Sequence, residues 1–61
     1  MAYVIQKAGG LYVAKPGHAH SYTNRLDYAR KFQTREEAEG NLCPENERVV
    51  ELERVLDLYR R

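Results

Sequence analysis

Three side chains of this 61-residue chain could take part in nucleophilic or metal chemistry: His18, His20 and Cys43. The two histidines belong to the stretch PGHAHSYT at 16–23, and in an extended loop they would point to the same side. A transition-metal site takes three or four ligands, and Cys43 belongs to a different predicted element. We therefore interpret the stretch as a polar loop, and we expect no bound metal and no cofactor.

As the single cysteine, Cys43 could also be a nucleophile that a histidine activates. Such a hydrolase needs a third group that orients the base, together with a pocket around the substrate. A domain of this size has room for one thin core and no deep cleft. A cysteine at a helix end before a proline is typical of a small buried hydrophobe, so the sequence predicts a protein that is not an enzyme.

The composition indicates one folded domain that spans residues 1–61. Apolar residues make up 43% of the chain and include five tyrosines, which is typical of a globular domain rather than a disordered one. No apolar run approaches the roughly 20 residues that cross a membrane, and the N-terminal residues lack the pattern of a signal peptide. Because one cysteine forms no internal disulfide, we expect a cytoplasmic protein without a membrane partner.

The net charge of +1 conceals an uneven distribution along the chain. Residues 1–35 hold six Lys or Arg and one acid, whereas residues 36–61 hold four Arg and eight acids. Such a dipolar chain could steer a charged partner. The alternative is that the two halves fold together and that their charges interleave on a solvated surface.

The N-terminal part of the chain predicts two strands around a glycine turn. Residues 2–7 and 11–15 are rich in β-branched and aromatic types, and the two glycines of the 8–10 turn can take the positive φ of a tight hairpin. A proline then ends the second strand, because it has no N–H to donate. We expect residues 17–28 to be irregular and residues 29–33 to be extended.

A helix is predicted over 34–43. Thr34 followed by Glu37 matches a capping box, in which the hydroxyl and the carboxylate bond to free N–H groups of the first turn. Phe32, just before the cap, would pack on Ala38 and fix the direction in which the chain enters the helix. A proline follows and cannot continue the helix.

The C-terminal stretch is open to two interpretations. Val49 and Leu52 follow helical spacing, whereas Val50 and Leu52 alternate with charged residues as in a strand. We expect a strand over 47–53 and a short helical turn over 54–60, because a two-stranded hairpin needs a third strand to be stable. An all-helical tail is the alternative.

The predicted fold is a small α+β domain of the order β-β-(β)-α-β. Its antiparallel sheet would have three to four strands, with one helix packed on one face and a short helical turn at the C-terminus. The residues expected in the core are Val4, Leu11, Val13, Phe32, Ala38, Leu42, Val50 and Leu52.

Several stretches taken together resemble small proteins encoded by bacteriophages and prophages. These stretches are YVI, LYV, PG, SYT, the strand-to-helix unit AR-K-F-x-TREEAE and CPENERVV. The resemblance covers nearly the whole chain and brings no catalytic residue with it. It implies an accessory role in phage biology, inside the host cell, and very short phage proteins of this kind often act by binding, including binding to host defence systems.

We therefore interpret the chain as a protein that binds and inhibits a host protein, such as a component of a CRISPR nucleoprotein complex. Tyrosine and arginine are enriched in binding hot spots, and the edges of a small sheet pair readily with other chains. The side chains of Tyr3 and Tyr12 are expected on the sheet face opposite the helix. The full set of expected contact residues is Tyr3, Tyr12, His20, Tyr22, Arg25 and Tyr28.

A small nucleic-acid-binding regulator is the alternative function. Lys15, Arg30 and Lys31 lie among tyrosines in the sequence, and basic grooves with stacking aromatics bind single strands. The chain carries no recognised nucleic-acid motif and is not strongly basic, so a protein partner is favoured. The limited core and the unpaired strand edges also predict a homodimer.

Overall fold

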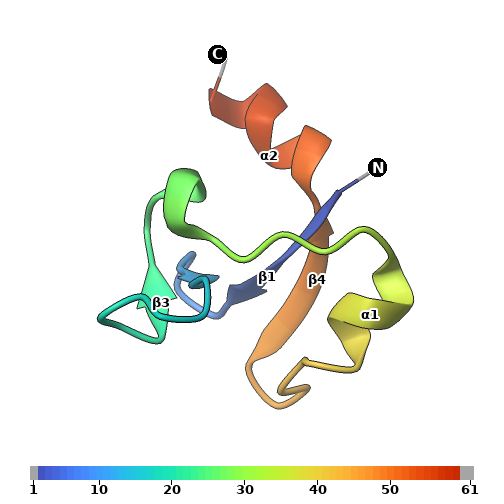
Figure 1. Ribbon diagram of the computed structural model, residues 1–61. Helices are drawn as coiled ribbons and strands as arrows, with labels where there is room; N and C mark the ends of the chain where they lie inside the picture. The colour runs from blue at the N-terminus through green and yellow to red at the C-terminus, as the bar shows by residue number, and fades with distance from the viewer. Residues whose placement is uncertain (1, 60–61) are drawn as a thin grey trace.

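Four short antiparallel strands form one sheet in the computed structural model, which describes residues 2–59. The strands lie in the order β3-β2-β1-β4, which is the strand order of a Greek key. Two helices and one 3₁₀ helix complete the domain (Figure 1). The elements are β1 (Tyr3–Lys7), β2 (Tyr12–Val13), β3 (Tyr22–Thr23), η1 (Leu26–Tyr28), α1 (Arg35–Glu39), β4 (Glu47–Glu51) and α2 (Leu52–Tyr59). The expected α+β class is confirmed.

The predicted hairpin forms, with shorter strands than expected. Gly9 and Gly10 have φ of 99° and 97°, the left-handed conformation that glycine adopts without steric cost. Lys7 N–H donates to the Leu11 carbonyl at 2.7 Å, which closes the turn. The strand β2 ends at Val13 rather than at 15. From Val13 onward the chain pairs with another segment instead of with β1.

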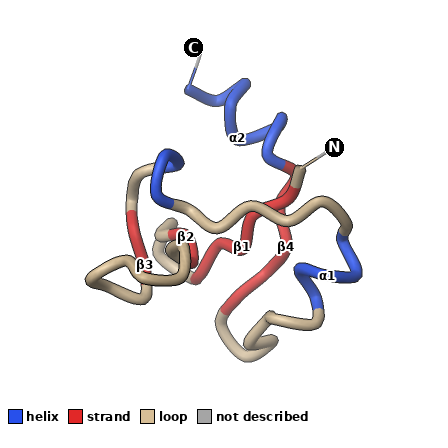
Figure 2. Tube along the Cα trace, viewed as in Figure 1, coloured by secondary structure: helices blue, strands red, loops and turns tan. Residues whose placement is uncertain are grey.

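That segment is the chain from Tyr28 to Phe32, which lies between β1 and β2 where these strands diverge. Arg30 N–H donates to the Val13 carbonyl at 2.9 Å, while Phe32 and Tyr3 exchange two backbone hydrogen bonds of 2.8 Å. Its path can be followed in Figure 2 as the loop between the 3₁₀ helix and α1. The expected extended segment at 29–33 is thus confirmed, whereas the expectation of an irregular 17–28 is wrong in part, since β3 and η1 lie there.

The helix α1 begins as the sequence predicts and ends earlier. The Thr34 hydroxyl accepts the Glu37 N–H at 3.1 Å, and the Glu37 carboxylate accepts the Gln33 N–H at 3.3 Å. The expected end at 43 is wrong, because the helix stops at Glu39. The Asn41 side chain donates to the Glu37 carbonyl at 2.9 Å and competes there with continuation of the helix.

The C-terminal stretch divides into a strand and a helix, as expected. Five residue pairs join β4 to β1, so the all-helical alternative is wrong. The strand is shorter than the predicted 47–53, and α2 begins at Leu52. Of the helical turn predicted over 54–60, residue 60 lies outside the described residues.

The core consists of two clusters, one on each face of the sheet. On the α1 face, Ile5, Phe32 and Ala38 are buried together. On the other face, the cluster is Val4, Tyr12, Ala29 and Val55, with α2 and η1 contributing. The sheet is therefore covered on both faces, by α1 on one and by α2 with η1 on the other.

The expected core is partly confirmed. Val4, Phe32 and Ala38 are buried, and a second group packs half-buried against the clusters: Val13, Leu42, Val50 and Leu52. Leu11 belongs to neither cluster. Six further residues are buried that the sequence did not predict in the core: Ile5, Tyr12, Ala14, Thr23, Ala29 and Val55.

Candidate interaction surface

A group of exposed and half-buried side chains lies on the loop that precedes β3 and on the 3₁₀ helix that follows it. We call it the loop patch, and it consists of His18, His20, Arg25 and Tyr28. Lys15 N–H donates to the Tyr28 carbonyl at 2.8 Å, and His18 N–H donates to the Lys15 carbonyl at 3.1 Å. These backbone bonds bring together rings that are far apart in the sequence, so the centroids of His18 and Tyr28 lie 5.3 Å apart.

The loop patch combines aromatic surface with a cation. The guanidinium carbon of Arg25 lies 5.3 Å from the centroid of the Tyr28 ring, within the range of a cation–π contact. Tyr28 is 44% exposed, so part of its ring surface is accessible to a partner. Arg25 also lies 3.7 Å from Asp27, and both of these side chains are mostly exposed. The patch can therefore offer stacking, hydrogen bonding and one cation to a partner.

The two histidines of the loop patch are tied to each other through the backbone. His18 Nδ1 lies 3.1 Å from the His20 carbonyl oxygen and 3.2 Å from the His20 nitrogen. A neutral ring with a bare Nδ1 accepts the His20 N–H, and a ring protonated at Nδ1 donates to the carbonyl.

Metal-ligating side chains are not gathered anywhere in the described chain. Among residues 2–59, no group of three or more His, Cys, Asp and Glu side chains is placed to hold an ion. Cys43 is exposed on the loop between α1 and β4, so the expectation that it is a buried hydrophobe is wrong. Because α1 ends before this position, Cys43 does not lie on the helix face that packs against the sheet.

Tyr22 joins three elements and lies apart from the loop patch. Its hydroxyl donates to the Glu47 carboxylate at 2.5 Å, and the Lys7 ammonium lies 4.6 Å from its ring centroid. The hydrogen bond to Glu47 raises the pKa of Tyr22, and loss of hydration adds to this. The other oxygen of Glu47 accepts the Cys43 N–H at 3.0 Å, so Tyr22 connects β3 to the start of β4.

Tyr3 and Tyr12 lie on opposite faces of the sheet, which corrects the expectation that both would emerge on one free face. Tyr12 is 5% exposed and packs with Val4 and Val55. Tyr3 packs half-buried on the α1 face, with the Arg35 guanidinium carbon 5.3 Å from its ring centroid. The cause is the register, because Tyr12 pairs with Gln6 and therefore shares the face of Val4.

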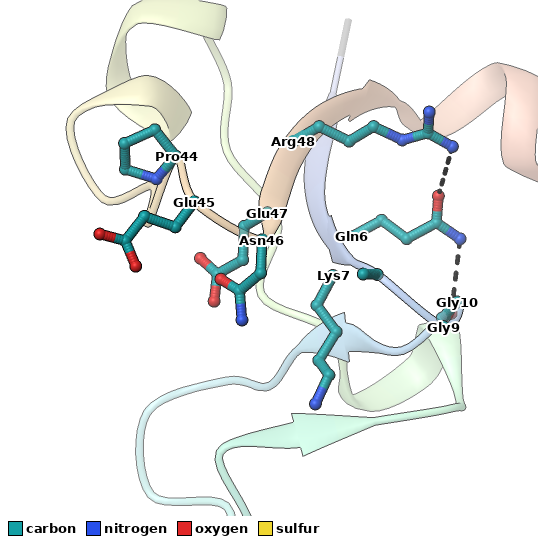
Figure 3. Close-up of a pocket in the computed structure, with 10 residues that line it drawn as sticks. Gln6, Lys7, Gly9, Gly10, Pro44, Glu45, Asn46, Glu47 and Arg48 are labelled. Carbon is teal, nitrogen blue, oxygen red and sulfur yellow. Dashed lines mark hydrogen bonds between the residues drawn. The ribbon is translucent and has the colours of Figure 1, made fainter.

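A polar hollow of about 440 Å³ lies between the hairpin turn and the loop before β4 (Figure 3). The Gln6 side chain lines it, donating to the Gly10 carbonyl at 3.4 Å and accepting from Arg48 at 3.5 Å. The Lys7 ammonium is placed over Tyr22. Gln6 thus contacts Arg48, and Lys7 contacts Tyr22. The described residues that line the hollow include no nucleophile with an adjacent base.

The structure thus brings together three of the six expected contact residues: His20, Arg25 and Tyr28. His18 belongs with them and was absent from the expected set. Its proximity to Tyr28 depends on the Lys15 to Tyr28 backbone bond, which no local pattern in the sequence indicates.

Comparison of the chain with protein-family models, with curated proteins and with solved structures finds no match. Within residues 2–59, no helix is long and apolar enough to cross a membrane.

Proposed function

We propose that this protein acts by binding another protein through the loop patch, and that it inhibits this partner by occupying it. The observation that carries the proposal is the position of Tyr28, a 44% exposed residue whose ring lies close to both His18 and Arg25. A rigid aromatic group beside an arginine loses little conformational entropy on binding and is the usual composition of a hot spot.

The partner we propose is a host defence component, such as a CRISPR effector complex in the cytoplasm of a bacterial cell. This part of the proposal is supported by the sequence resemblance to small phage and prophage proteins. A nucleoprotein complex carries both aromatic-binding and anionic surfaces, so it matches the mixed chemistry of the loop patch.

A capture experiment tests the proposal. The chain, tagged at one end, is incubated with a lysate of a host strain that expresses its defence complexes, and bound proteins are identified. We expect a defence protein to be retained by the wild-type chain and lost with the double variant Arg25→Glu and Tyr28→Ala. Circular dichroism first establishes that this variant is folded.

Leu58→Ser is the matched control, because Leu58 is a 68% exposed hydrophobic side chain on α2. It removes apolar surface without touching the loop patch, so it should retain the partner. Equal capture by the double variant and the wild-type chain would contradict the proposal.

Nucleic acid is the second candidate, and the Arg25–Tyr28 contact is the observation that favours it. Single strands bind where bases stack on rings beside cations. A salt titration of the captured complex separates the two functions. Binding to phosphates weakens steeply with salt, because counterions are released, whereas we expect a shallow dependence for the protein interface.

A further inference from the structure

The outer edge of β4 is unpaired in the part of the chain that the structure describes. β4 is the last strand in the order β3-β2-β1-β4. Its pairing with β1 is flanked by the bond from Leu52 N–H to the Ala2 carbonyl, so the even-numbered residues of β4 direct their backbone groups toward β1. The N–H and C=O groups of Val49 and the N–H of Glu51 consequently point to the outer edge, where they can pair with a further strand.

Three arginines surround this edge, and two of them lie near one carboxylate. A hollow of about 280 Å³ is lined by Arg35, Arg48, Arg54 and Glu51, with two valines between them. The Glu51 carboxylate lies 4.0 Å from Arg35 and 3.8 Å from Arg54. Arg48 contacts the neutral side chain of Gln6. Three positive charges against one negative charge leave the lining with a net charge of +2.

The arginines lie on both faces of β4. Arg48 pairs with Gln6 and shares the face of Val50, whereas Arg35 approaches from α1 on the face of Tyr3. A strand added beyond β4 would direct its side chains alternately to these two faces. An acidic side chain on either face would therefore meet a guanidinium group.

We propose that the outer edge of β4 binds an extended acidic segment of another protein by strand addition. The backbone of that segment pairs with Val49, and its carboxylates pair with Arg35 and Arg48, with the geometry that favours arginine for this role. A neighbouring hollow of about 520 Å³ accepts an uncharged side chain of the same segment. Its lining is Leu42, Pro44 and Val49 together with two arginines and two glutamates, Arg35, Arg48, Glu39 and Glu47. This surface lies at the opposite end of the sheet from the loop patch (Figure 1), so the inference is independent of the proposed function.

A second copy of this chain meets like charges in two of the registers that could pair at this edge. A two-fold pairing centred on Val49 would place Glu47 opposite Glu51 of the other copy, and like charges directly opposite each other destabilise a sheet. Centring the pairing on Arg48 would place two arginines opposite each other. An acidic partner segment avoids these conflicts in registers that place uncharged residues opposite Glu47 and Glu51.

The test measures binding of a fluorescent, end-capped peptide of glutamate and valine, with carboxylates on both faces of its extended form, to the full-length chain by fluorescence anisotropy. We expect saturable binding that weakens about tenfold or more with Arg48→Glu, because this places a like charge against the peptide. Lys15→Glu is the matched control. It makes the same change of charge on an exposed loop away from β4, and it should change the affinity less than about twofold.

Two altered peptides test the same contacts on the wild-type chain, so this test does not depend on the folding of a protein variant. Replacing the glutamates with glutamines, or methylating alternate backbone nitrogens, should abolish binding. Binding of the methylated peptide as strong as that of the parent would show that strand pairing is not used, and equal binding of the glutamine peptide would show that the arginines are not used. Sedimentation that shows a dimer disrupted by Val49→Pro, together with no peptide binding, would assign the edge to a second copy and overturn the proposal.

Discussion

Two tyrosines that look alike in the sequence have different roles in the structure. Tyr12 is 5% exposed within the cluster on the α2 face, whereas Tyr28 is 44% exposed in the loop patch. A domain of 61 residues has a small margin of stability, so the loss of one buried ring is a large fraction of it. Tyr12 therefore stabilises the fold, whereas the exposed part of the Tyr28 ring can contact a partner.

We predict that Tyr12→Ala lowers the free energy of unfolding by about 3 kcal/mol or more, since it removes a buried ring and leaves a cavity. Tyr28→Ala should change it by less than about 1 kcal/mol. Urea denaturation followed by circular dichroism measures both variants under the same conditions. Similar midpoints for the two variants would show that the rings are equally exposed in solution.

A second prediction at the residue scale concerns the hydrogen bond from Tyr22 to Glu47. The bond needs the protonated phenol, and it raises the pKa of Tyr22 above its ordinary value of 10.0. The folded chain thus holds this proton more tightly than the unfolded chain, so the bond contributes its full stability below about pH 10 and loses it as the pH rises through the raised pKa.

Tyr22→Phe should therefore unfold at a lower urea concentration than the wild-type chain at neutral pH, and the difference should narrow above about pH 10. Glu47→Gln is the companion variant, because it removes the charge that disfavours the phenolate. In it the pKa of Tyr22, followed by ultraviolet absorbance, should fall toward the ordinary value. A difference in midpoint that stays constant up to strongly alkaline pH would contradict this assignment.

At the scale of elements, the start of α1 is the part that local sequence determines most directly. The Thr34 hydroxyl accepts the Glu37 N–H, which satisfies one of the free donors of the first turn. The helix is short, and Ala38 is its buried residue, so the cap is a large part of what stabilises it.

Thr34→Ala should destabilise the domain by about 0.5–2 kcal/mol through loss of this cap. Thr34→Ser is the control, since serine supplies the same hydroxyl and should retain most of the stability. Denaturant midpoints compare the three chains. If the alanine variant matched the wild-type chain, the cap would not be formed in solution.

The elements that sequence reasoning predicted are those with a local cause. The glycine turn, the capping box and the strand that leads into α2 each follow from residue types a few positions apart. The segment from Tyr28 to Phe32 lies between β1 and β2 for a different reason. Its position depends on backbone hydrogen bonds from Arg30 to Val13 and from Phe32 to Tyr3. Such long-range pairing has no periodic signal, and neither has the register that buries Tyr12.

The expected contact residues were predicted less accurately than these elements, for the same reason. Its members were chosen by residue type, and type alone does not separate a buried tyrosine from an exposed one. The arginines around the β4 edge come from α1, β4 and α2, so only the folded chain gathers them.

At the scale of the whole molecule, the expected homodimer is a separate prediction. The sheet has two edges, at β3 and β4, and small domains often gain stability by association. Sedimentation equilibrium at high micromolar concentration should give the mass of two chains. A mass near the 7.1 kDa of one chain would exclude the homodimer under these conditions.

The structure also shows how the charged parts of the chain lie relative to one another. The acidic C-terminal part and the basic N-terminal part meet at the contact between Arg35 and Glu51. The charges therefore interleave over part of the surface, while the hollow at the β4 edge keeps an excess of positive charge.

The most direct test of the central claim is a nuclear magnetic resonance titration of the isotope-labelled chain with its captured protein partner. We predict that the largest changes in amide signals fall at 17–28, around His18, Arg25 and Tyr28, while the signals of Val4 and Ile5 in the core keep their dispersion. Changes confined to α2 or to the polar hollow beside the hairpin turn, with 17–28 unaffected, would contradict the claim that the loop patch binds the partner.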